Sequence, residues 1–338
     1  MRLLVIRLSS IGDILLTTPI LRALKATFQE AEIDFLTKPS FTALLEGNPA
    51  LKTIFTTENF EPKQRYDLVI DLQHNLTSRK YHQAGKKIVC YHKENWKKFL
   101  LVNFKVNLYR GYESVVERYA KSLAPFGVRL DEKGCEVFLN HEEKDFGKKH
   151  RTAKTPVLAV CFGARHVTKR FPPERFASAL NQLLEKNPID IWLLGGKEDA
   201  PTAEEILSHV RARSSVKNFS GQHTLRETAA MLASSDAVLS NDTGLMHMAA
   251  AFQKPMVVLF GSSVKEFGFL PYKSAFELLE VEGLECRPCS HIGREHCPKL
   301  HFKCMRDISE SGLVNAVENA LKRSGSNEKQ RDESGNAY

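Results

Sequence analysis

The stretch SNDTGLMH at 240–247 joins an apolar run to an alanine-rich helical pattern. Asp242 and Thr243 are residue types that favour the start of a helix, and Gly244 lets a large group approach the backbone closely. The first turn of a helix has unpaired N–H groups and a partial positive charge, and His247 lies one turn further on. The stretch therefore predicts a strand-to-helix turn, which serves either as an ordinary connection or as an anion-binding site.

Around this turn, short apolar runs alternate with helical patterns in two series, which the charged stretch 141–155 separates. In the first series we expect strands at 2–8, 32–37, 66–72 and 87–91 and helices at 12–28 and 113–126. In the second series we expect strands at 157–162, 190–194, 237–240 and 256–260 and helices at 173–187, 202–213, 225–234 and 244–252. Strands that alternate with helices imply parallel sheets covered on both faces. We therefore predict an α/β protein with two doubly wound domains facing a cleft, at 1–150 and 151–323, and a disordered tail at 324–338.

Three other motifs accompany the first one in a fixed order. The four are RLSSIGDILLTTPILRALK at 7–25, KRFPPERFA at 169–177, LLGGKED at 193–199 and SNDTGLMHMAAA at 240–251. In this order and spacing they resemble glycosyltransferase family 9, the heptosyltransferases that build the inner core of bacterial lipopolysaccharide. A block of cysteines at 286–305 resembles the tail of part of that family. The resemblance implies the GT-B architecture, with two Rossmann-like domains of which the first holds the acceptor and the second the nucleotide sugar.

The turn at 8–13 follows the first expected strand, and ligands of a doubly wound sheet bind where strands end. The chain has no G-x-G-x-x-G fingerprint, which argues against a dinucleotide-dependent dehydrogenase. Glycosyl transfer needs a base that takes the proton of the acceptor hydroxyl. The resemblance assigns that role to Asp13, and the alternative is that Asp13 only caps the helix that starts there.

The donor side must stabilise a departing nucleoside diphosphate. Many glycosyltransferases do so with a metal held by an Asp-x-Asp pair, which this chain lacks, so fixed dipoles and cations would have to serve instead. Arg170 is an alternative to its neighbour Lys169, while the role of Glu198 beside the nucleoside rests on the resemblance. Glu198 could instead favour the start of a helix, and Asp199 is an equally good cap. The expected donor-binding residues are Lys169, Glu198, Asp242, Thr243, Gly244 and His247.

The resemblance implies a glycosyltransferase that inverts the anomeric carbon without a metal, and the expected donor is ADP-heptose. The expected acceptor is a lipopolysaccharide core or another lipid-linked sugar. Another sugar nucleotide is an alternative donor within the same family. The motifs are also compatible with a nucleotide-sugar epimerase or hydrolase of the same fold, and with a non-catalytic regulator that binds nucleotide or lipid.

Composition agrees with a globular protein, since 42% of the 338 residues are hydrophobic and 26% are charged. The net charge of +8 is concentrated between Arg79 and Arg110, where nine Lys and Arg face one acid, Glu94. Such a segment suits an anionic membrane or a phosphorylated lipid acceptor, or it is only a solvated face. No nucleic-acid module accompanies it, so nucleic acid is not an expected partner. The residues of this basic segment that we select are Lys86, Lys87, Lys93, Trp96, Lys97 and Lys98.

No apolar run approaches the roughly 18 residues of a membrane helix, and the start of the chain lacks the pattern of a signal peptide. We therefore expect a cytoplasmic protein, attached peripherally to the inner face of the cytoplasmic membrane if the basic segment binds lipid.

Four cysteines, Cys286, Cys289, Cys297 and Cys304, fall within nineteen residues near the end of the chain. Reduced thiols in such a cluster indicate metal or redox chemistry more often than disulfides. The cluster lacks a second Cys-x-x-Cys, so a structural zinc site and a group of buried, loosely paired thiols both remain open. Catalysis is expected to require no cofactor. The other cysteines, Cys90, Cys135 and Cys161, are expected in the core.

Overall fold

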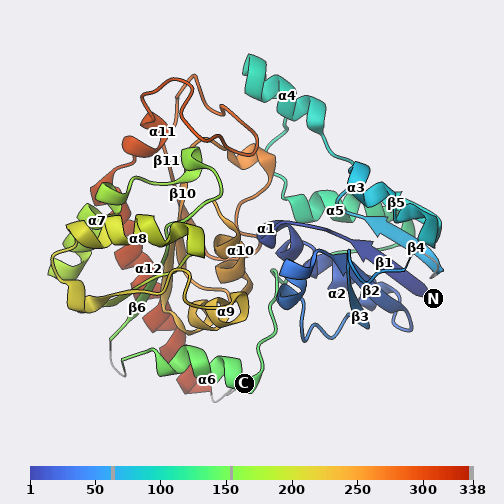
Figure 1. Cartoon of the computed structure of the whole chain (residues 1–338), viewed down its shortest axis with the longest axis horizontal. Coiled ribbons are helices and arrows are strands. Elements are labelled where there is room, and N and C mark those ends of the chain that lie inside the picture. The colour runs from blue at the N-terminus through green and yellow to red at the C-terminus, as the bar shows by residue number, and fades with distance from the viewer. Residues whose placement is uncertain (62–64, 153–154, 335–338) are drawn as a thin grey trace.

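The computed structural model describes residues 1–61, 65–152 and 155–334, which form two parallel β-sheets covered by helices (Figure 1). This confirms the α/β class and the two doubly wound units. The strands of the first sheet are β1 (Arg2–Ile6), β2 (Glu32–Thr37), β3 (Thr53–Thr56), β4 (Tyr66–Asp71) and β5 (Gly85–Cys90). Those of the second are β6 (Val157–Cys161), β7 (Asp190–Leu193), β8 (Val216–Asn218), β9 (Ala237–Asn241), β10 (Met256–Phe260) and β11 (Phe276–Glu280).

The strand orders fix where a ligand can sit. The first sheet has the order β3-β2-β1-β4-β5 and the second β11-β10-β9-β6-β7-β8. The chain changes direction across the sheet between β1 and β4 in one unit, and between β6 and β9 in the other. Ligands of such sheets bind outside the carboxyl ends of the strands at this switch point. The turns after β1, β4, β6 and β9 are therefore the favoured places for a site.

Helices cover both sheets. In the first unit they are α1 (Ile11–Leu15), α2 (Thr18–Thr27), α3 (Leu76–Arg79), α4 (Asn95–Phe104) and α5 (Val115–Leu123). In the rest of the chain they are α6 (His141–Lys149), α7 (Pro173–Lys186), α8 (Ala200–His209), α9 (Leu225–Ser234), α10 (Gly244–Ala251), α11 (Lys303–Arg306) and α12 (Glu310–Ser334). Short 3-10 turns lie between them, at η1 (Pro39–Leu44), η2 (His82–Ala84), η3 (Ala124–Phe126), η4 (Val167–Lys169), η5 (Lys197–Asp199), η6 (Arg213–Ser215) and η7 (Lys265–Phe267).

The predicted helix at 12–28 is wrong as one element, because it consists of two. The hydroxyl groups of Thr17 and Thr18 donate to the carbonyls of Ile14 and Leu15, and Pro19 lies at the start of α2. Proline has no N–H to continue the preceding helix but fits the first turn of a new one. The edge strands β3, β8 and β11 were not expected. They are short and only partly buried, so they show no continuous apolar run.

The stretch 141–155 was expected to be a simple link, but most of it forms α6; residues 153–154 lie outside the described part. Asn140 and Glu143 form a reciprocal cap at its start, and the helix packs against α9 of the second unit. The helix α12 likewise continues to Ser334, into the segment 324–338 for which a disordered tail was predicted. Helix-forming residues such as Glu and Lys in that segment favour this extension, and residues 335–338 lie outside the described part.

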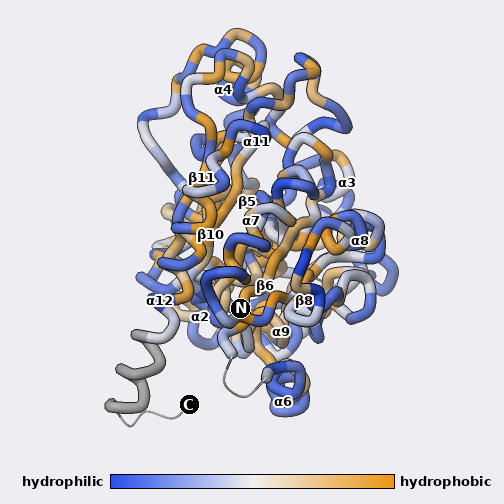
Figure 2. The backbone as a smooth tube through the Cα atoms, turned by 90° about the vertical axis from the view of Figure 1, so that its left-hand side faces the viewer, coloured by the Kyte–Doolittle hydropathy of each residue, from blue (hydrophilic) through white to orange (hydrophobic). Residues whose placement is uncertain are grey.

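The core is continuous between the two units. The central strands β1 and β6 are buried along nearly all of their length, as parallel strands covered on both faces should be. In Figure 2 the strands β6 and β10 are coloured as hydrophobic, whereas α6 on the outside is hydrophilic. One apolar cluster includes residues of both sheets, and Ile11 and Leu245 from the facing helices α1 and α10 pack against it. Within the described residues, no helix has the length and apolar character to cross a membrane.

Candidate active site

The turns after β1 and β9 meet where the two units touch, because α1 packs against α10 (Figure 1). A Cβ atom at Gly12 would lie 2.4 Å from Cδ2 of His247, and a Cβ at Gly244 would lie 2.6 Å from Cβ of Ile11. Only glycine permits so close an approach at both positions. The structure thus brings together Asp13 and His247, which the sequence placed in separate turns.

Asp13 is held as an ionised carboxylate. Its Oδ1 lies 2.6 Å from Nη2 of Arg7, and its Oδ2 accepts hydrogen bonds from the hydroxyl and the backbone N–H of Ser10. Burial alone would raise the pKa of Asp13, but the charge of Arg7 and the bonds from Ser10 outweigh it and hold that pKa below its ordinary value. The bond from the Ser10 N–H shows that Asp13 does cap α1. Its side chain remains 19% exposed, so capping does not close the carboxylate off. Its role as a base stays a prediction.

Arg7 is itself immobilised by the surrounding backbone. It donates to the carbonyls of Leu72 and Ser9 and to the hydroxyl of Tyr119. The guanidinium is a planar fork with fixed donors, so these bonds orient the group that contacts Asp13. Arg7 was not predicted as a site residue, although it begins the motif at 7–25.

In the second unit, Asp242 pairs with a cation from another turn. Its Oδ2 lies 2.7 Å from Nζ of Lys169 and accepts the hydroxyl of Ser263 at 2.6 Å. Burial would raise the pKa of Asp242, but Lys169 and Ser263 lower it overall. Arg170 donates instead to the carbonyl of Ala164, so Lys169 is the cation that reaches this acid. Ser263 was missed, although its place after β10, the neighbour of β9, is a usable signal.

The helix α10 begins at Gly244, as the stretch 240–247 predicted, but neither Asp242 nor Thr243 caps it with its side chain. Thr243 is the N-cap residue, and its side chain makes no capping hydrogen bond. Asp242 does not cap α10, because its carboxylate is turned to Lys169 and Ser263. The N–H groups of the first turn are therefore available to an anion.

His247 is buried beside both acids. Its Nδ1 has no hydrogen-bond partner in the described part of the chain. Burial lowers its pKa to about 4, against the opposing charges of Asp242 and Asp13, so the imidazole is neutral near pH 7. A neutral imidazole offers one donor and one acceptor, and the buried Nδ1 is a polar atom in need of a ligand.

The acids of the LLGGKED motif divide their roles. Asp199 is buried, accepts the N–H of Gly196 at 3.0 Å and lies against Gly163 after β6. It therefore caps η5, and burial raises its pKa. Glu198 is exposed at the same turn. Because Asp199 supplies the cap, Glu198 remains free for the nucleoside role, which stays a prediction.

The basic segment is not one surface, as its residues point in three directions. Lys86 and Lys87 lie on β5, where Lys86 pairs with Asp67. Lys97, on α4, pairs with Glu94.

The other two lysines that we selected from the segment, Lys93 and Lys98, face inward. Burial, with the charge of Arg118 next, lowers the pKa of Lys98 to about 8. Burial, with the charge of Arg7 next, also lowers the pKa of Lys93, which is near Asp13. These two lysines therefore belong to the surroundings of Asp13 and not to the outer surface.

The helix α4 projects from the first unit (Figure 1) and carries exposed aromatic side chains. Trp96 is 55% exposed, Phe99 57% and Phe104 63%. The surfaces of soluble proteins rarely expose several large apolar side chains in one patch unless a binding partner covers them.

The C-terminal cysteines converge on one small cavity, which all four line together with His301. Sγ of Cys286 lies 3.8 Å from Nε2 of His301. Four thiols and an imidazole are a donor set that zinc accepts. In the part of the chain that the structure describes, however, no three of their ligand atoms lie within 4.8 Å of one another, so a structural zinc ion at this cluster stays a prediction. Of the other cysteines, Cys135 and Cys161 are buried as expected, whereas Cys90 is partly exposed because β5 is an edge strand.

A profile of glycosyltransferase family 9 (heptosyltransferase) matches residues 62–299. The chain belongs to this family. It is 26% identical over 302 residues to lipopolysaccharide heptosyltransferase 2 of Salmonella typhimurium, covering 79% of this chain and 84% of the relative. It is 25% identical to lipooligosaccharide heptosyltransferase 2 of Campylobacter jejuni serotype O:2, covering 93% and 96%.

Solved structures show the same fold. The ADP-heptose lipopolysaccharide heptosyltransferase II of Escherichia coli superposes with a TM-score of 0.74 at 20% identity, over 96% of this chain and all (100%) of that one. A family 9 glycosyltransferase from Veillonella parvula superposes with a TM-score of 0.78 at 20% identity, over 95% and 97%. This family 9 chain is therefore a glycosyltransferase of GT-B architecture.

Proposed function

We propose that this family 9 glycosyltransferase transfers heptose from ADP-heptose to a lipopolysaccharide core or another lipid-linked acceptor. The observation that carries the proposal is the meeting of two turns from different units, one with Asp13 and the other with Asp242 and His247. Lys169 reaches Asp242 from the loop after β6. Such a meeting places a base beside an anion site, which is what transfer from a nucleotide sugar requires. Relatives that are lipopolysaccharide heptosyltransferases support the substrate class.

In the proposed reaction, Asp13 takes the proton of the acceptor hydroxyl as its oxygen bonds to the anomeric carbon. The bond from that carbon to the diphosphate oxygen breaks on the opposite side, so ADP leaves and the configuration inverts. Arg7 keeps Asp13 ionised and oriented before the proton arrives. One base and no covalent intermediate suffice for this displacement.

The departing diphosphate is bound without a metal. The N-terminus of α10, with Thr243 and Gly244 in its first turn, supplies N–H groups, and His247 offers its unpaired Nδ1. Lys169 exchanges Asp242 for a phosphate oxygen, since an ammonium on a flexible stem can move between two anions. Glu198 binds the nucleoside at the neighbouring turn. Contact between the two units excludes water and so limits hydrolysis of the donor.

The enzyme works at the cytoplasmic face of the inner membrane, where a lipid-linked acceptor is anchored. The helix α4 provides the contact, because its aromatic side chains can enter the lipid interface beside Lys97. Lys98 on α4 and Lys93 just before α4 are near Asp13, where they can bind an anionic group of the acceptor.

The membrane contact is tested with the double variant Trp96→Ser/Phe99→Ser. We expect its binding to vesicles that contain phosphatidylglycerol to fall by at least about tenfold, because each of the two removed rings contributes apolar area worth of the order of 1 kcal/mol or more. Leu76→Ser on α3 is the matched control, since that side chain is 84% exposed but lies on another helix. Equal vesicle binding by wild type and double variant would remove α4 from the membrane contact.

The transfer itself is tested with ADP-heptose, UDP-glucose and GDP-mannose, each with a purified lipopolysaccharide core acceptor and with either EDTA or Mg²⁺. Of the three donors, we expect only ADP-heptose to give a product, which should be heavier than the acceptor by one heptose. The rate should be the same in EDTA as in Mg²⁺. A requirement for Mg²⁺, or transfer from another nucleotide, overturns the corresponding part of the proposal. Turnover of donor without acceptor would instead support an epimerase or hydrolase.

A further inference from the structure

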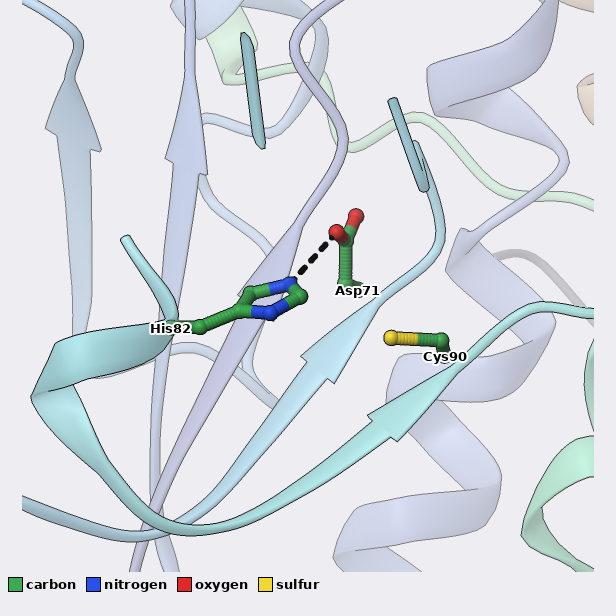
Figure 3. A group of neighbouring side chains, drawn as sticks. All are labelled: Asp71, His82 and Cys90. Atoms are coloured by element: carbon green, nitrogen blue, oxygen red, sulfur yellow. Dashed lines mark hydrogen bonds and ion pairs between the residues drawn. The ribbon is translucent and has the colours of Figure 1, made fainter. Parts of the chain in front are cut away.

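A second group of reactive side chains lies at the carboxyl ends of β4 and β5, apart from the donor turns. Asp71 and Cys90 occupy paired positions on these neighbouring strands, and His82 belongs to η2 between them. Figure 3 shows the His82 ring and the Cys90 sulfur directed toward the carboxylate of Asp71. One ligand atom from each residue lies within 4.8 Å of the other two.

The carboxylate of Asp71 is held in place from several sides. Its Oδ1 accepts the backbone N–H groups of Gln73 and His74 at 3.0 and 2.7 Å. Its Oδ2 accepts the hydroxyl of Ser78 at 2.7 Å and lies 2.8 Å from Nε2 of His82. Outer hydrogen bonds of this kind orient the ligands of a metal and are a regular part of metal sites.

The geometry does not fit a catalytic triad. In such a triad the acid contacts one ring nitrogen of the histidine and the nucleophile contacts the other. Here Nε2 of His82 lies 2.8 Å from the carboxylate of Asp71, and a ligand atom of Cys90 lies within 4.8 Å of the acid as well as of the histidine, so the histidine does not separate the two. Convergence of three ligand atoms on one point is the arrangement that a metal ion requires.

We propose that Asp71 Oδ2, His82 Nε2 and Cys90 Sγ bind one divalent cation of the zinc type. Carboxylate, imidazole and thiolate are all ligands of zinc, and three protein ligands leave a fourth place for water. On binding, the Nε2 proton of His82 moves to Nδ1 and the thiol of Cys90 releases its proton to solvent. The separation of 2.8 Å between Asp71 Oδ2 and His82 Nε2 needs to open only to about 3.3 Å, the ligand spacing of a tetrahedral zinc.

The side chains permit entry of an ion. Asp71 is fully buried, but the side chain of His82 is 21% exposed and Cys90 is partly exposed. The ion would also fix the start of the segment that leads to α4. The carbonyl of Asp71 accepts the N–H of Tyr91 at 2.9 Å, and Nδ1 of His74 lies 2.7 Å from the Tyr91 carbonyl. The bound cation thus stiffens the base of α4.

Cobalt(II) titration tests the site, because a Co²⁺ ion bound to a thiolate gives a charge-transfer absorption band. The background variant Cys289→Ser/Cys297→Ser removes two thiols of the C-terminal cluster. After treatment with a chelator, this variant should bind one equivalent of Co²⁺ with a thiolate band. Adding Cys90→Ser should abolish the band and weaken binding at least tenfold, and adding His82→Gln should weaken binding similarly.

Cys135→Ser is the matched control, since it removes a buried thiol of the same unit outside the group. It should leave the band unchanged, and thermal unfolding checks that each variant is folded. If the background variant does not fold, the wild type and Cys90→Ser are compared directly, and the latter should bind one equivalent less. A folded background without the band, or a band that survives Cys90→Ser, overturns the proposal whatever the transferase activity.

Discussion

The turns at the starts of α1 and α10 are built alike but are held differently. Each has a glycine against the opposite turn and an acid paired with a cation, at 2.6 Å for Asp13 with Arg7 and 2.7 Å for Asp242 with Lys169. Arg7 directly follows β1, at the start of the same turn, and makes three further hydrogen bonds. Lys169 comes from a different loop, and Asp242 is the acid that it contacts.

This difference fits the two tasks that we propose. A base must be ionised and correctly placed before each reaction, and a planar guanidinium fixed by the backbone achieves that. A phosphate site must bind and release its ligand in every reaction. A lysine can exchange its carboxylate partner for an anion of higher charge. The same kind of acid–cation pair can therefore be a rigid support in one turn and an exchangeable contact in the other.

The largest expected effect separates the two turns by function. Asp13→Asn keeps the shape and the cap but removes the base, so the transfer rate should fall by about a hundredfold or more. ADP affinity, measured by calorimetry, should stay unchanged because we propose that the donor binds at the other turn. Asp67→Asn, an exposed acid paired with Lys86, is the control. Loss of ADP affinity in Asp13→Asn would mean that the two turns do not divide the work.

The next effect concerns stability and pH. The pKa of His247 is about 4 in the folded protein against 6.5 ordinarily, so protonation favours the unfolded chain. As pH falls from about 6.5 to about 4, His247 should therefore lower the free energy of unfolding by about 3 kcal/mol in total. Below that range its contribution stays constant.

His247→Gln should therefore lose less stability over that pH range than the wild type does. Urea unfolding at several pH values measures the difference. His209→Gln, which changes an exposed histidine, should behave as the wild type does. Parallel curves for His247→Gln and wild type would contradict the neutral, buried state of His247.

A smaller effect sharpens the contrast between the two cations. Lys169→Ala should raise the dissociation constant of ADP between about tenfold and a hundredfold, the usual worth of a charge-assisted hydrogen bond. Lys186→Ala, which removes a surface ion pair with Glu318, should leave it unchanged. If Lys169→Ala binds ADP as tightly as wild type, Lys169 serves only to hold Asp242.

The smallest expected effect tests the contact between the turns. Gly12→Ala places a methyl group against His247, so the turns must separate slightly and the transfer rate should fall by about tenfold. Gly325→Ala, which meets nothing within 4 Å, is the control. An unchanged rate in Gly12→Ala would show that the close approach is unnecessary for transfer.

Much of the fold was predictable because its central strands are buried runs with regular spacing. The strand at 32–37 and the helix at 225–234 agree with the structure residue for residue. The edge strands β3, β8 and β11 and the helix α6 were missed because their partly exposed residues carry no continuous apolar pattern. Their formation depends on pairing and capping partners that a sequence pattern does not reveal.

The site was predictable only residue by residue. The motifs pointed to Asp13, Lys169 and Asp242, but not to the pairs that these residues form. Arg7 and Ser263 acquire their place from the folded sheets, and the linear basic segment divides because β5 and α4 point in different directions. Cys90, expected in the core, instead meets Asp71 and His82 across an edge that only the strand register defines.

The absence of room for a methyl group between Gly12 and His247 also bears on how such enzymes can diversify. In a hybrid that joins the first half of this chain to the second half of a relative, the second half would have to fit a glycine turn with which it did not evolve. Acceptor and donor preferences could then be recombined only among relatives whose facing turns have matching shapes. The contact between Gly12 and His247 thus limits which first and second halves can be joined in one functional protein.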